Sequence, residues 1–229
     1  MKILITGARG MVARAAAAYA SSIGDEVIAL DRGRLDISDR ENVRAVINSM
    51  RPDAVVNCAA FTNVDGAESD RATCYAANAE GAENLALACR EIGAKFLTIS
   101  TDYVFDGKKK GFYVESDTPN PLSIYASSKY EGELRTRAAD PNAIVLRSGW
   151  IYGPGGTNFL SVMPELLAKD TAIKVVSDSR GTPTYAGDLV RRIRELIDKD
   201  ASGIFHAQVF PNHKHPAALR GKRLPLLAV

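Results

Sequence analysis

Short apolar runs rich in β-branched residues recur along the chain, with stretches of helical character between them. The runs are KILIT, EVIAL, DAVVNCA, KFLTIS and AIVLRS, at residues 2–6, 26–30, 53–59, 95–100 and 143–148. Continuous apolar runs, in contrast to alternating ones, are typical of strands buried on both faces of a parallel sheet. Because strands and helices alternate with short connections, the pattern predicts an α/β fold with a Rossmann-type, doubly wound parallel sheet.

Local signals mark the ends of several helices. Ser38 and Glu41 have the spacing of a capping box, which predicts a helix start. Gly93 is placed to end, as a C-cap, a long helical segment that begins near Cys74. Pro164 lies inside a predicted helix and lacks an amide donor, so we expect it to kink or restart that helix.

The pattern loosens after Arg147, where we expect a small, incomplete C-terminal substrate lobe. Insertions after the late strands of such sheets build substrate pockets. The predicted organisation is a dinucleotide-binding unit over residues 1–148, a partial substrate lobe over residues 149–207, with helices to about residue 169 and over residues 186–197, and an atypical basic tail over residues 208–229. The sheet and helices of the first unit are expected to lie before Arg147.

The composition is that of one ordinary globular unit. The chain has 229 residues, of which 46% are hydrophobic and 24% charged, and its formal net charge of +2 gives no reason to expect nucleic acid as a partner. Cys58, Cys74 and Cys89 show no CxxC spacing, so we expect neither disulfides nor a metal site. The N-terminus lacks a signal or membrane segment, which predicts a cytoplasmic protein without membrane contact.

The first predicted strand is followed directly by GARGMVA, residues 7–13. Gly7 and Gly10 permit a tight turn and close approach of the backbone to a pyrophosphate, and the start of the next helix favours negative charge. The third small position is Ala13. Glycine spacing alone is a weak signal, but its place at the start of a strand–helix–strand unit favours a dinucleotide site.

Asp31 follows the second strand, where an acidic residue would hold the ribose hydroxyls of NAD. Arg9, Arg32 and Arg34 lie nearby and could instead bind a 2′-phosphate. The balance favours NADPH slightly and leaves NADH open.

Tyr125 and Lys129 are four residues apart, so on a helix they share one face. A neighbouring ammonium would lower the pKa of the tyrosine, making it a better acid at neutral pH. Thr101 ends the fourth strand beside the expected cofactor crevice, where its hydroxyl could bind a carbonyl oxygen that Tyr125 protonates. The order of these motifs predicts one proton-transfer site.

These motifs together resemble the extended short-chain dehydrogenases/reductases, and among them the dTDP-4-dehydrorhamnose reductases (RmlD-like). The matching segments, between Met1 and about His206, are NCAAFTNVDGAES, NAEGAENLA, STDYVFDG, PLSIYASSKYEGE, LRSGWIYGPGGTNF and DSRGTPTYAGDL. A set of long matches is far more specific than any single motif.

The resemblance implies that Thr101, Tyr125 and Lys129 form the catalytic triad. The cofactor would be held by Gly7, Arg9, Gly10, Met11 and Val12 at the phosphates, by Asp36 and Ile37 near adenine, by Ala59, Ala60 and Thr62 along the ribose and phosphates, with Asp31, Asn78, Ser100, Tyr125 and Lys129 completing the set. The substrate would contact Thr101, Tyr103, Tyr125 and Trp150. For Trp150, buried packing is the alternative to an aromatic contact with a sugar.

The implied activity is NAD(P)H-dependent reduction of the 4-keto group of a dTDP-4-dehydro-6-deoxy sugar to dTDP-L-rhamnose, with a homodimer possible. A nucleotide-sugar epimerase or dehydratase is one alternative. The other is a cofactor-binding regulatory subunit, of the kind that serves methionine adenosyltransferase, because fold does not guarantee activity.

The resemblance fails near the end of the chain. From Gly203 onward there is no Asp or Glu, and the three histidines, His206, His213 and His215, all fall here. A shifted reading frame or truncated copy and a natural short variant both explain this. Two nearby histidines supply too few ligands for a metal. We expect NAD(P)H binding with weak or absent reduction, and poor order after about Phe210.

Overall fold

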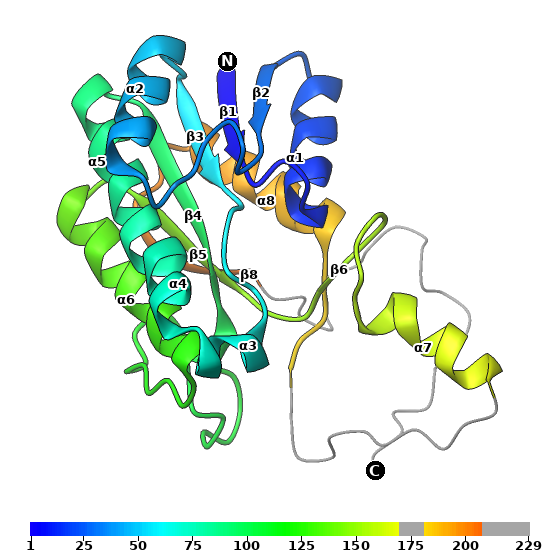
Figure 1. Ribbon diagram of the computed structural model, residues 1–229. Coiled ribbons are helices and arrows are strands. Elements are labelled where there is room, and N and C mark those ends of the chain that lie inside the picture. Colours follow the sequence, from blue (N-terminus) through cyan, green and yellow to red (C-terminus); the bar gives the residue numbers. More distant parts are fainter. Residues whose placement is uncertain (170–180, 208–229) are drawn as a thin grey trace.

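The computed structural model describes residues 1–169 and 181–207. Its centre is a sheet of six parallel strands in the order β2-β1-β3-β4-β5-β8 (Figure 1). The strands are β1 (Lys2–Thr6), β2 (Glu26–Leu30), β3 (Ala54–Asn57), β4 (Lys95–Thr101), β5 (Ile144–Ser148) and β8 (Gly203–Ala207). Each apolar run of the sequence thus forms a strand of this sheet, and the predicted parallel α/β fold is confirmed.

Helices cover both faces of the sheet (Figure 1). One face carries α1 (Met11–Ser22) and α8 (Ala186–Asp198). The other carries α2 (Arg40–Met50), α5 (Gly81–Ile92) and α6 (Ile124–Ala139). The short helices α3 (Val64–Ser69) and α4 (Arg71–Tyr75) lead into a π-helical turn, Ala76–Glu80, that runs on into α5.

Successive residues of a strand belong to two separate hydrophobic cores. Ile3 and Ile5 of β1 pack with apolar residues of α1 and α8, whereas Leu4 packs with those of α2 and α5. Because successive side chains of a strand point to opposite faces, a strand covered on both sides must be apolar at every position. This explains why the runs are continuous.

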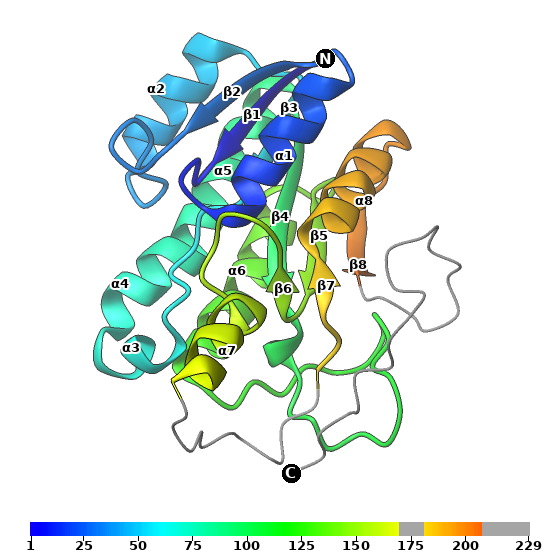
Figure 2. The same ribbon diagram turned by 90° about the vertical axis from the view of Figure 1, so that its right-hand side faces the viewer.

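A small lobe lies beyond the carboxyl ends of the strands (Figure 2). It contains a two-stranded parallel sheet, β6 (Ile151–Tyr152) with β7 (Thr184–Tyr185), and helix α7 (Phe159–Ala168). A side chain at Gly156 would come within 2.8 Å of the Met11 Cβ, so the lobe's loop packs directly on the start of α1. The Asn158 amide also lies 3.8 Å from the Met11 sulfur.

Three details differ from the sequence predictions. The N-cap of α2 is Asp39, whose side chain accepts from the Asn42 amide, while Ser38 instead donates to Asp36. The capping box was therefore placed one residue early. Helix α7 continues through Pro164, so of the two predicted alternatives the restart is wrong and the kink stays a prediction.

The segment after residue 148 also contributes to the main sheet, because β8 pairs with β5 and α8 covers one face. The expectation that all of this sheet lies before Arg147 is therefore wrong, while the division into lobes stays a prediction. Gly93 ends α5 at a φ of 73°, as expected of a C-cap. The expected poor order after about Phe210 falls on residues outside the described part of the chain.

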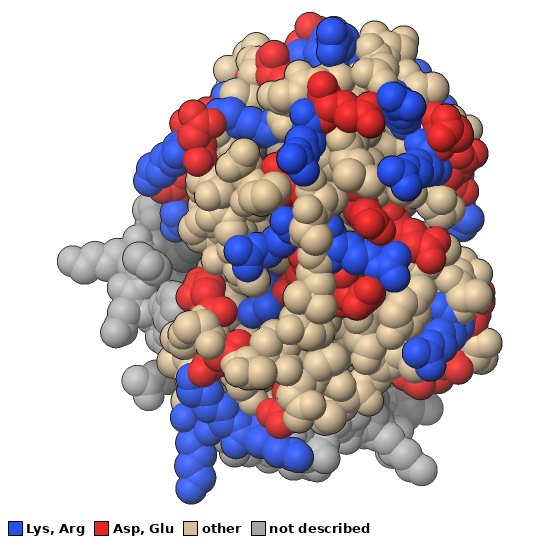
Figure 3. All heavy atoms as spheres, turned by 90° about the vertical axis from the view of Figure 1, so that its left-hand side faces the viewer, with Lys and Arg blue, Asp and Glu red and all other residues tan. Residues whose placement is uncertain are grey.

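Acidic and basic side chains are mixed over the face formed by α2, α5 and α6 (Figure 3). Several of them pair with each other, as Arg44 does with Glu91 and Arg135 with Glu131.

Within residues 1–169 and 181–207, no helix is long and apolar enough to cross a bilayer.

Candidate active site

The glycine-rich turn between β1 and α1 is built for close backbone approach. Gly7 has a φ of 68°, and a Cβ there would lie 2.9 Å from the Ala59 backbone. Gly10 is the N-cap of α1 and provides no side-chain cap to the helix. The first amides of α1 therefore remain available to an anion, as a dinucleotide pyrophosphate requires.

A cleft of about 370 Å³ opens at the carboxyl ends of β3, β4 and β5. Its lining includes three cofactor candidates from the loop after β3, namely Ala59, Ala60 and Thr62, together with Val12 from α1. It also includes Thr101, Tyr103, Tyr125, Lys129 and Trp150, so the predicted catalytic and substrate residues meet in one place.

Tyr125 and Thr101 both line this cleft. Burial raises the pKa of Tyr125 to about 12, although the nearby Thr101 hydroxyl opposes this effect. We expected the Lys129 ammonium to lower the pKa of Tyr125, but burial dominates. The Tyr125 hydroxyl is therefore a neutral phenol near neutral pH, with a proton to donate.

Lys129 is buried, with 6% of its surface exposed, and its Nζ donates to the Ile99 carbonyl at 2.7 Å. Burial lowers the pKa of Lys129 to about 8, and the charge of Glu133 opposes this effect. Lys129 thus lies one helical turn from Tyr125, as predicted, with a proton that it holds only weakly.

Asp102 is a further acidic group at the cleft that the sequence predictions missed. Burial raises the pKa of its carboxyl to about 6, and the Thr101 hydroxyl lies 3.4 Å from its Oδ1. A side chain at Gly149 would overlap this carboxyl, so the glycine makes room for it. The available signal was its position next to Thr101 at a strand end.

Tyr103 and Trp150 border the cleft with 41% and 43% of their surfaces exposed. Tyr103 meets Tyr125 edge to face, with 6.1 Å between ring centroids. A side chain at Gly181 would overlap the Trp150 indole, so the backbone there packs on the ring. This exposure excludes a purely buried packing role for Trp150.

The side chains of Asn78 and Ser100 are bonded to other parts of the protein. The Asn78 side chain accepts from the Phe61 amide at 2.8 Å and donates to the Phe61 carbonyl at 3.1 Å. Its effect on a cofactor would therefore come through the loop after β3. The Ser100 hydroxyl donates to Glu133 at 2.5 Å, although Ser100 also lines the cleft.

The charged candidates at the adenosine end pair with each other. Arg9 bonds to Asp31 at 2.7 Å, and this contact holds the pKa of Asp31 below its usual range. Arg32 pairs with Asp36 at 3.1 Å. Arg34 is exposed and forms no ion pair with any described residue. Ile37 is buried beneath this loop, 2.7 Å from where a Gly81 side chain would begin.

Comparison with known proteins decides the family. The model of the RmlD substrate binding domain family matches residues 1–212. The chain belongs to this family.

Relatives within the RmlD family are reductases by name. The chain is 43% identical over 209 residues to dTDP-4-dehydrorhamnose reductase from Mycolicibacterium smegmatis, covering 90% of this chain and 63% of that protein. It is 41% identical over 212 residues to the reductase of the same name from Mycobacterium tuberculosis, covering 90% and 69%. The chain thus spans about two thirds of the length of these relatives.

Solved structures agree. The dTDP-4-dehydrorhamnose reductase of Clostridium acetobutylicum superposes with a TM-score of 0.88 at 41% identity, over 91% of this chain and 74% of that one. The Bacillus anthracis reductase in complex with NADP gives 0.87 at 37% identity, over 90% and 74%. A UDP-glucose 4-epimerase from Thermus thermophilus, at 22% identity and a TM-score of 0.77 over 91% and 78% of the two chains, shows the shared fold alone.

Proposed function

We propose that this member of the RmlD family reduces the 4-keto group of dTDP-4-dehydro-6-deoxy-L-mannose to give dTDP-L-rhamnose. The observation that carries the proposal is the convergence of Thr101, Tyr125 and Lys129 in one cleft, beside a glycine turn that fits a dinucleotide. The names of the relatives support the choice of substrate.

Each catalytic side chain has a role suited to its surroundings. Tyr125, held neutral by burial, donates its proton to the ketone oxygen as that oxygen gains negative charge. Thr101 orients the Tyr125 hydroxyl and offers a second hydrogen bond to the same oxygen. Lys129 attracts the phenolate that Tyr125 leaves behind and holds the ribose. A bound reduced nicotinamide would supply the hydride to the carbonyl carbon.

For the cofactor we propose NADPH, with NADH as a weaker alternative. Arg9 and Arg34 lie at the adenosine end, where a guanidinium can bind a phosphate through two hydrogen bonds. The complex of the Bacillus anthracis relative with NADP supports this choice. The pairing of Arg9 with Asp31 limits it, because the carboxylate competes with a 2′-phosphate for the same cation.

The test is a direct assay of the purified chain with NADPH and dTDP-4-dehydrorhamnose, following loss of the reduced cofactor and formation of dTDP-L-rhamnose. Binding of NADPH is measured separately by titration calorimetry. Turnover that depends on Tyr125 supports the proposal. Tight binding without turnover would favour a cofactor-binding regulatory subunit, and interconversion of sugar epimers without net loss of NADPH would favour an epimerase.

A further inference from the structure

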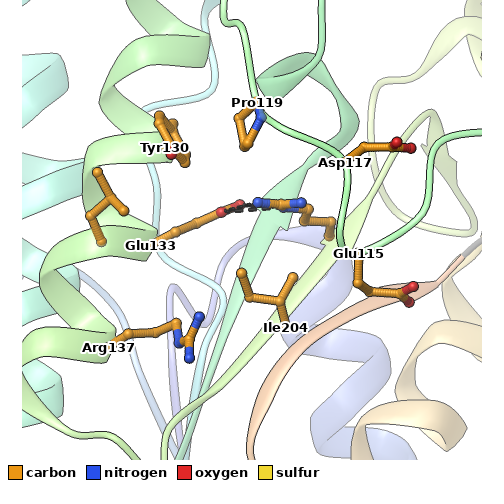
Figure 4. A pocket seen from close by; sticks show the side chains of 9 residues that line it. Glu115, Asp117, Pro119, Tyr130, Glu133, Arg137 and Ile204 are labelled. Atoms are coloured by element: carbon orange, nitrogen blue, oxygen red, sulfur yellow. Dashed lines mark hydrogen bonds and ion pairs between the residues drawn. The ribbon is translucent and has the colours of Figure 1, made fainter. Parts of the chain in front are cut away.

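A buried ion pair lies beside the active site, between α6 and β5. Arg147 and Glu133 are 3% and 2% exposed, and the Arg147 guanidinium bonds to the Glu133 carboxylate at 2.6 and 2.9 Å. Both residues line a second cavity, of about 210 Å³, into which Figure 4 shows Glu133 extending from α6. The Ser100 hydroxyl donates to the same carboxylate at 2.5 Å. Two side chains, from β4 and β5, thus fix this carboxylate of α6.

Such a pair is not explained by stability alone. Removing two charges from water costs several kcal/mol per ion, and apolar residues of equal volume often stabilise a fold as well or better. The Arg147–Glu133 pair is also almost fully buried, so solubility does not explain its charges. A role in the neighbouring site is the alternative.

The geometry connects Glu133 to Lys129. The two residues are four apart on α6, so they lie on one face with Cβ atoms about 5–6 Å apart. Their side chains bond to consecutive residues of β4, since Lys129 donates to the Ile99 carbonyl and Ser100 donates to Glu133. Lys129 forms no ion pair with any described carboxylate, so Glu133 acts on it through space.

Other titratable groups around Lys129 do not replace Glu133. Those at or near it are Tyr125 and Glu133 on α6, Cys74 on α4, Cys58 after β3, Asp102 after β4 and Arg147 on β5. Burial raises the pKa of Cys58 to about 12 and that of Tyr125 to about 12, so both are neutral near pH 7. Of the two carboxylates, Glu133 is the one whose charge raises the pKa of Lys129, and Arg147 and Ser100 both donate to it.

We propose that Glu133 is a positioning residue of the reductase, whose fixed carboxylate keeps the buried Lys129 in its ammonium form at neutral pH. Arg147 and Ser100 hold the carboxylate in place. The group that the Lys129 ammonium binds depends on the proposed function. The charge state of Lys129 does not depend on it. The consequence for that function is a limit on pH, because cofactor affinity falls once Lys129 loses its proton.

The test measures the charge of Lys129 in the protein without cofactor. Lysine labelled with ¹³C at Cε is titrated by NMR, and the Lys129 signal is assigned by its loss in Lys129→Met. In Glu133→Gln we expect the midpoint of Lys129 to fall by about one pH unit or more, because an opposite charge at this range favours the charged form. An unchanged midpoint in folded Glu133→Gln would overturn the proposal.

Two controls separate charge from structure. Glu133→Asp keeps the carboxylate and should keep the midpoint close to that of the unaltered protein, even if stability falls. Glu131→Gln removes a partly exposed carboxylate of the same helix, which pairs with Arg135, and should leave the midpoint unchanged. A role of Glu133 in stability alone would make Asp and Gln variants alike in their Lys129 midpoints.

The outcome stays decisive if Glu133→Gln does not fold, because the unaltered protein is informative by itself. A Lys129 midpoint below pH 7 in that protein would mean that no ammonium is maintained, and would overturn the proposal. Failure of the proposed reaction has a different signature, namely normal midpoints and normal NADPH binding with no conversion of the sugar nucleotide.

Discussion

Two groups of buried polar residues lie beside helix α6, one in the cleft and one at the Arg147–Glu133 pair, and they differ in how their charges are compensated. In the cleft, burial acts on Asp102, Tyr125 and Lys129 and shifts each pKa toward the neutral form, to about 6, 12 and 8. In the other group, Glu133 and Arg147 face each other at hydrogen-bond distance. The cleft groups thus lack a full counter-charge, whereas Glu133 and Arg147 compensate each other.

The difference teaches that burial alone does not identify a catalytic group. Glu133 is 2% exposed and Lys129 is 6% exposed, yet only the second is expected to touch a cofactor. What separates them is the number of bonds to the charged atoms. Glu133 accepts from two side chains, while Lys129 has a single neutral partner, the Ile99 carbonyl.

The largest expected effect distinguishes two tyrosines of α6, one in the cleft and one near the Arg147–Glu133 pair. Tyr125→Phe removes the proposed proton donor of the cleft and should lower kcat by about 10²- to 10⁴-fold. Affinity for NADPH should change little, because almost no volume is lost. Tyr130→Phe is the matched control, since Tyr130 lines the cavity at Glu133. Comparable turnover of the two variants would contradict the role given to Tyr125.

Replacing Arg147 and Lys129 each by methionine should change the free energy of unfolding in opposite directions. Arg147→Met leaves Glu133 without its guanidinium and should reduce the free energy of unfolding by about 3–5 kcal/mol. Lys129→Met removes a charge that burial disfavours and should raise it by about 2 kcal/mol at pH 7, after loss of the Ile99 hydrogen bond. Urea unfolding of both variants measures the contrast.

The gain in Lys129→Met should depend on pH in one direction. The pKa of Lys129 is about 8 in the folded chain and 10.5 as the ordinary value, so the unfolded chain binds more protons between these limits. The cost of burying the ammonium is full below pH 8 and declines as pH rises to 10.5. The advantage of the variant must therefore shrink over that window, and a constant advantage would argue against a buried ammonium.

A further change tests Asn78, whose side chain bonds to the loop after β3. Asn78→Ala removes both hydrogen bonds to Phe61 and should cost about 2 kcal/mol of unfolding free energy, with a few-fold loss of NADPH affinity. Thr136→Val is the contrasting control, because the buried Thr136 hydroxyl has no hydrogen-bond partner in the described structure. That variant should be as stable as the parent. Calorimetric titration with NADPH and thermal melting together decide the result.

The smallest effect concerns the choice of cofactor. Arg34→Ala should lower the ratio of kcat/KM for NADPH over NADH by a few-fold, about 1 kcal/mol or less, because solvent and salt screen the exposed Arg34. Arg44→Ala, which removes an exposed arginine remote from this loop, provides the control. An unchanged ratio would leave cofactor choice to Arg9 and Asp31.

Much of the fold could be predicted from the sequence because its signals are local. Each buried strand is a continuous apolar run, and Gly93 supplies the backbone conformation that ends α5. Joining of β8 to β5 could not be predicted, since it depends on contacts between segments that are distant along the chain. The start of α2 at Asp39 was missed because two adjacent residues were both acceptable caps.

Spacing along the sequence was enough to name the candidate catalytic residues, but it did not predict their electrostatics. Spacing placed Tyr125 and Lys129 on one face, while the depth of burial that controls their pKa values belongs to the tertiary structure. Arg147 did leave a signal, as the single charged residue within the apolar run AIVLRS. A charge inside a buried strand requires a partner, and Glu133, four residues after Lys129, was available to be recognised as that partner.

The packing of α8 on α1 has a consequence for the order of events during synthesis. Ala13, Ala16 and Ala20 of α1 are covered by Leu189 and Ile193 of α8, which leave the ribosome long afterwards. At rates of roughly 5–20 residues per second, the apolar side of α1 waits on the order of ten to thirty seconds for its cover. During that interval the nascent chain exposes an apolar surface next to the glycine-rich turn between β1 and α1. A chaperone or an early-bound cofactor therefore has a defined period in which to act.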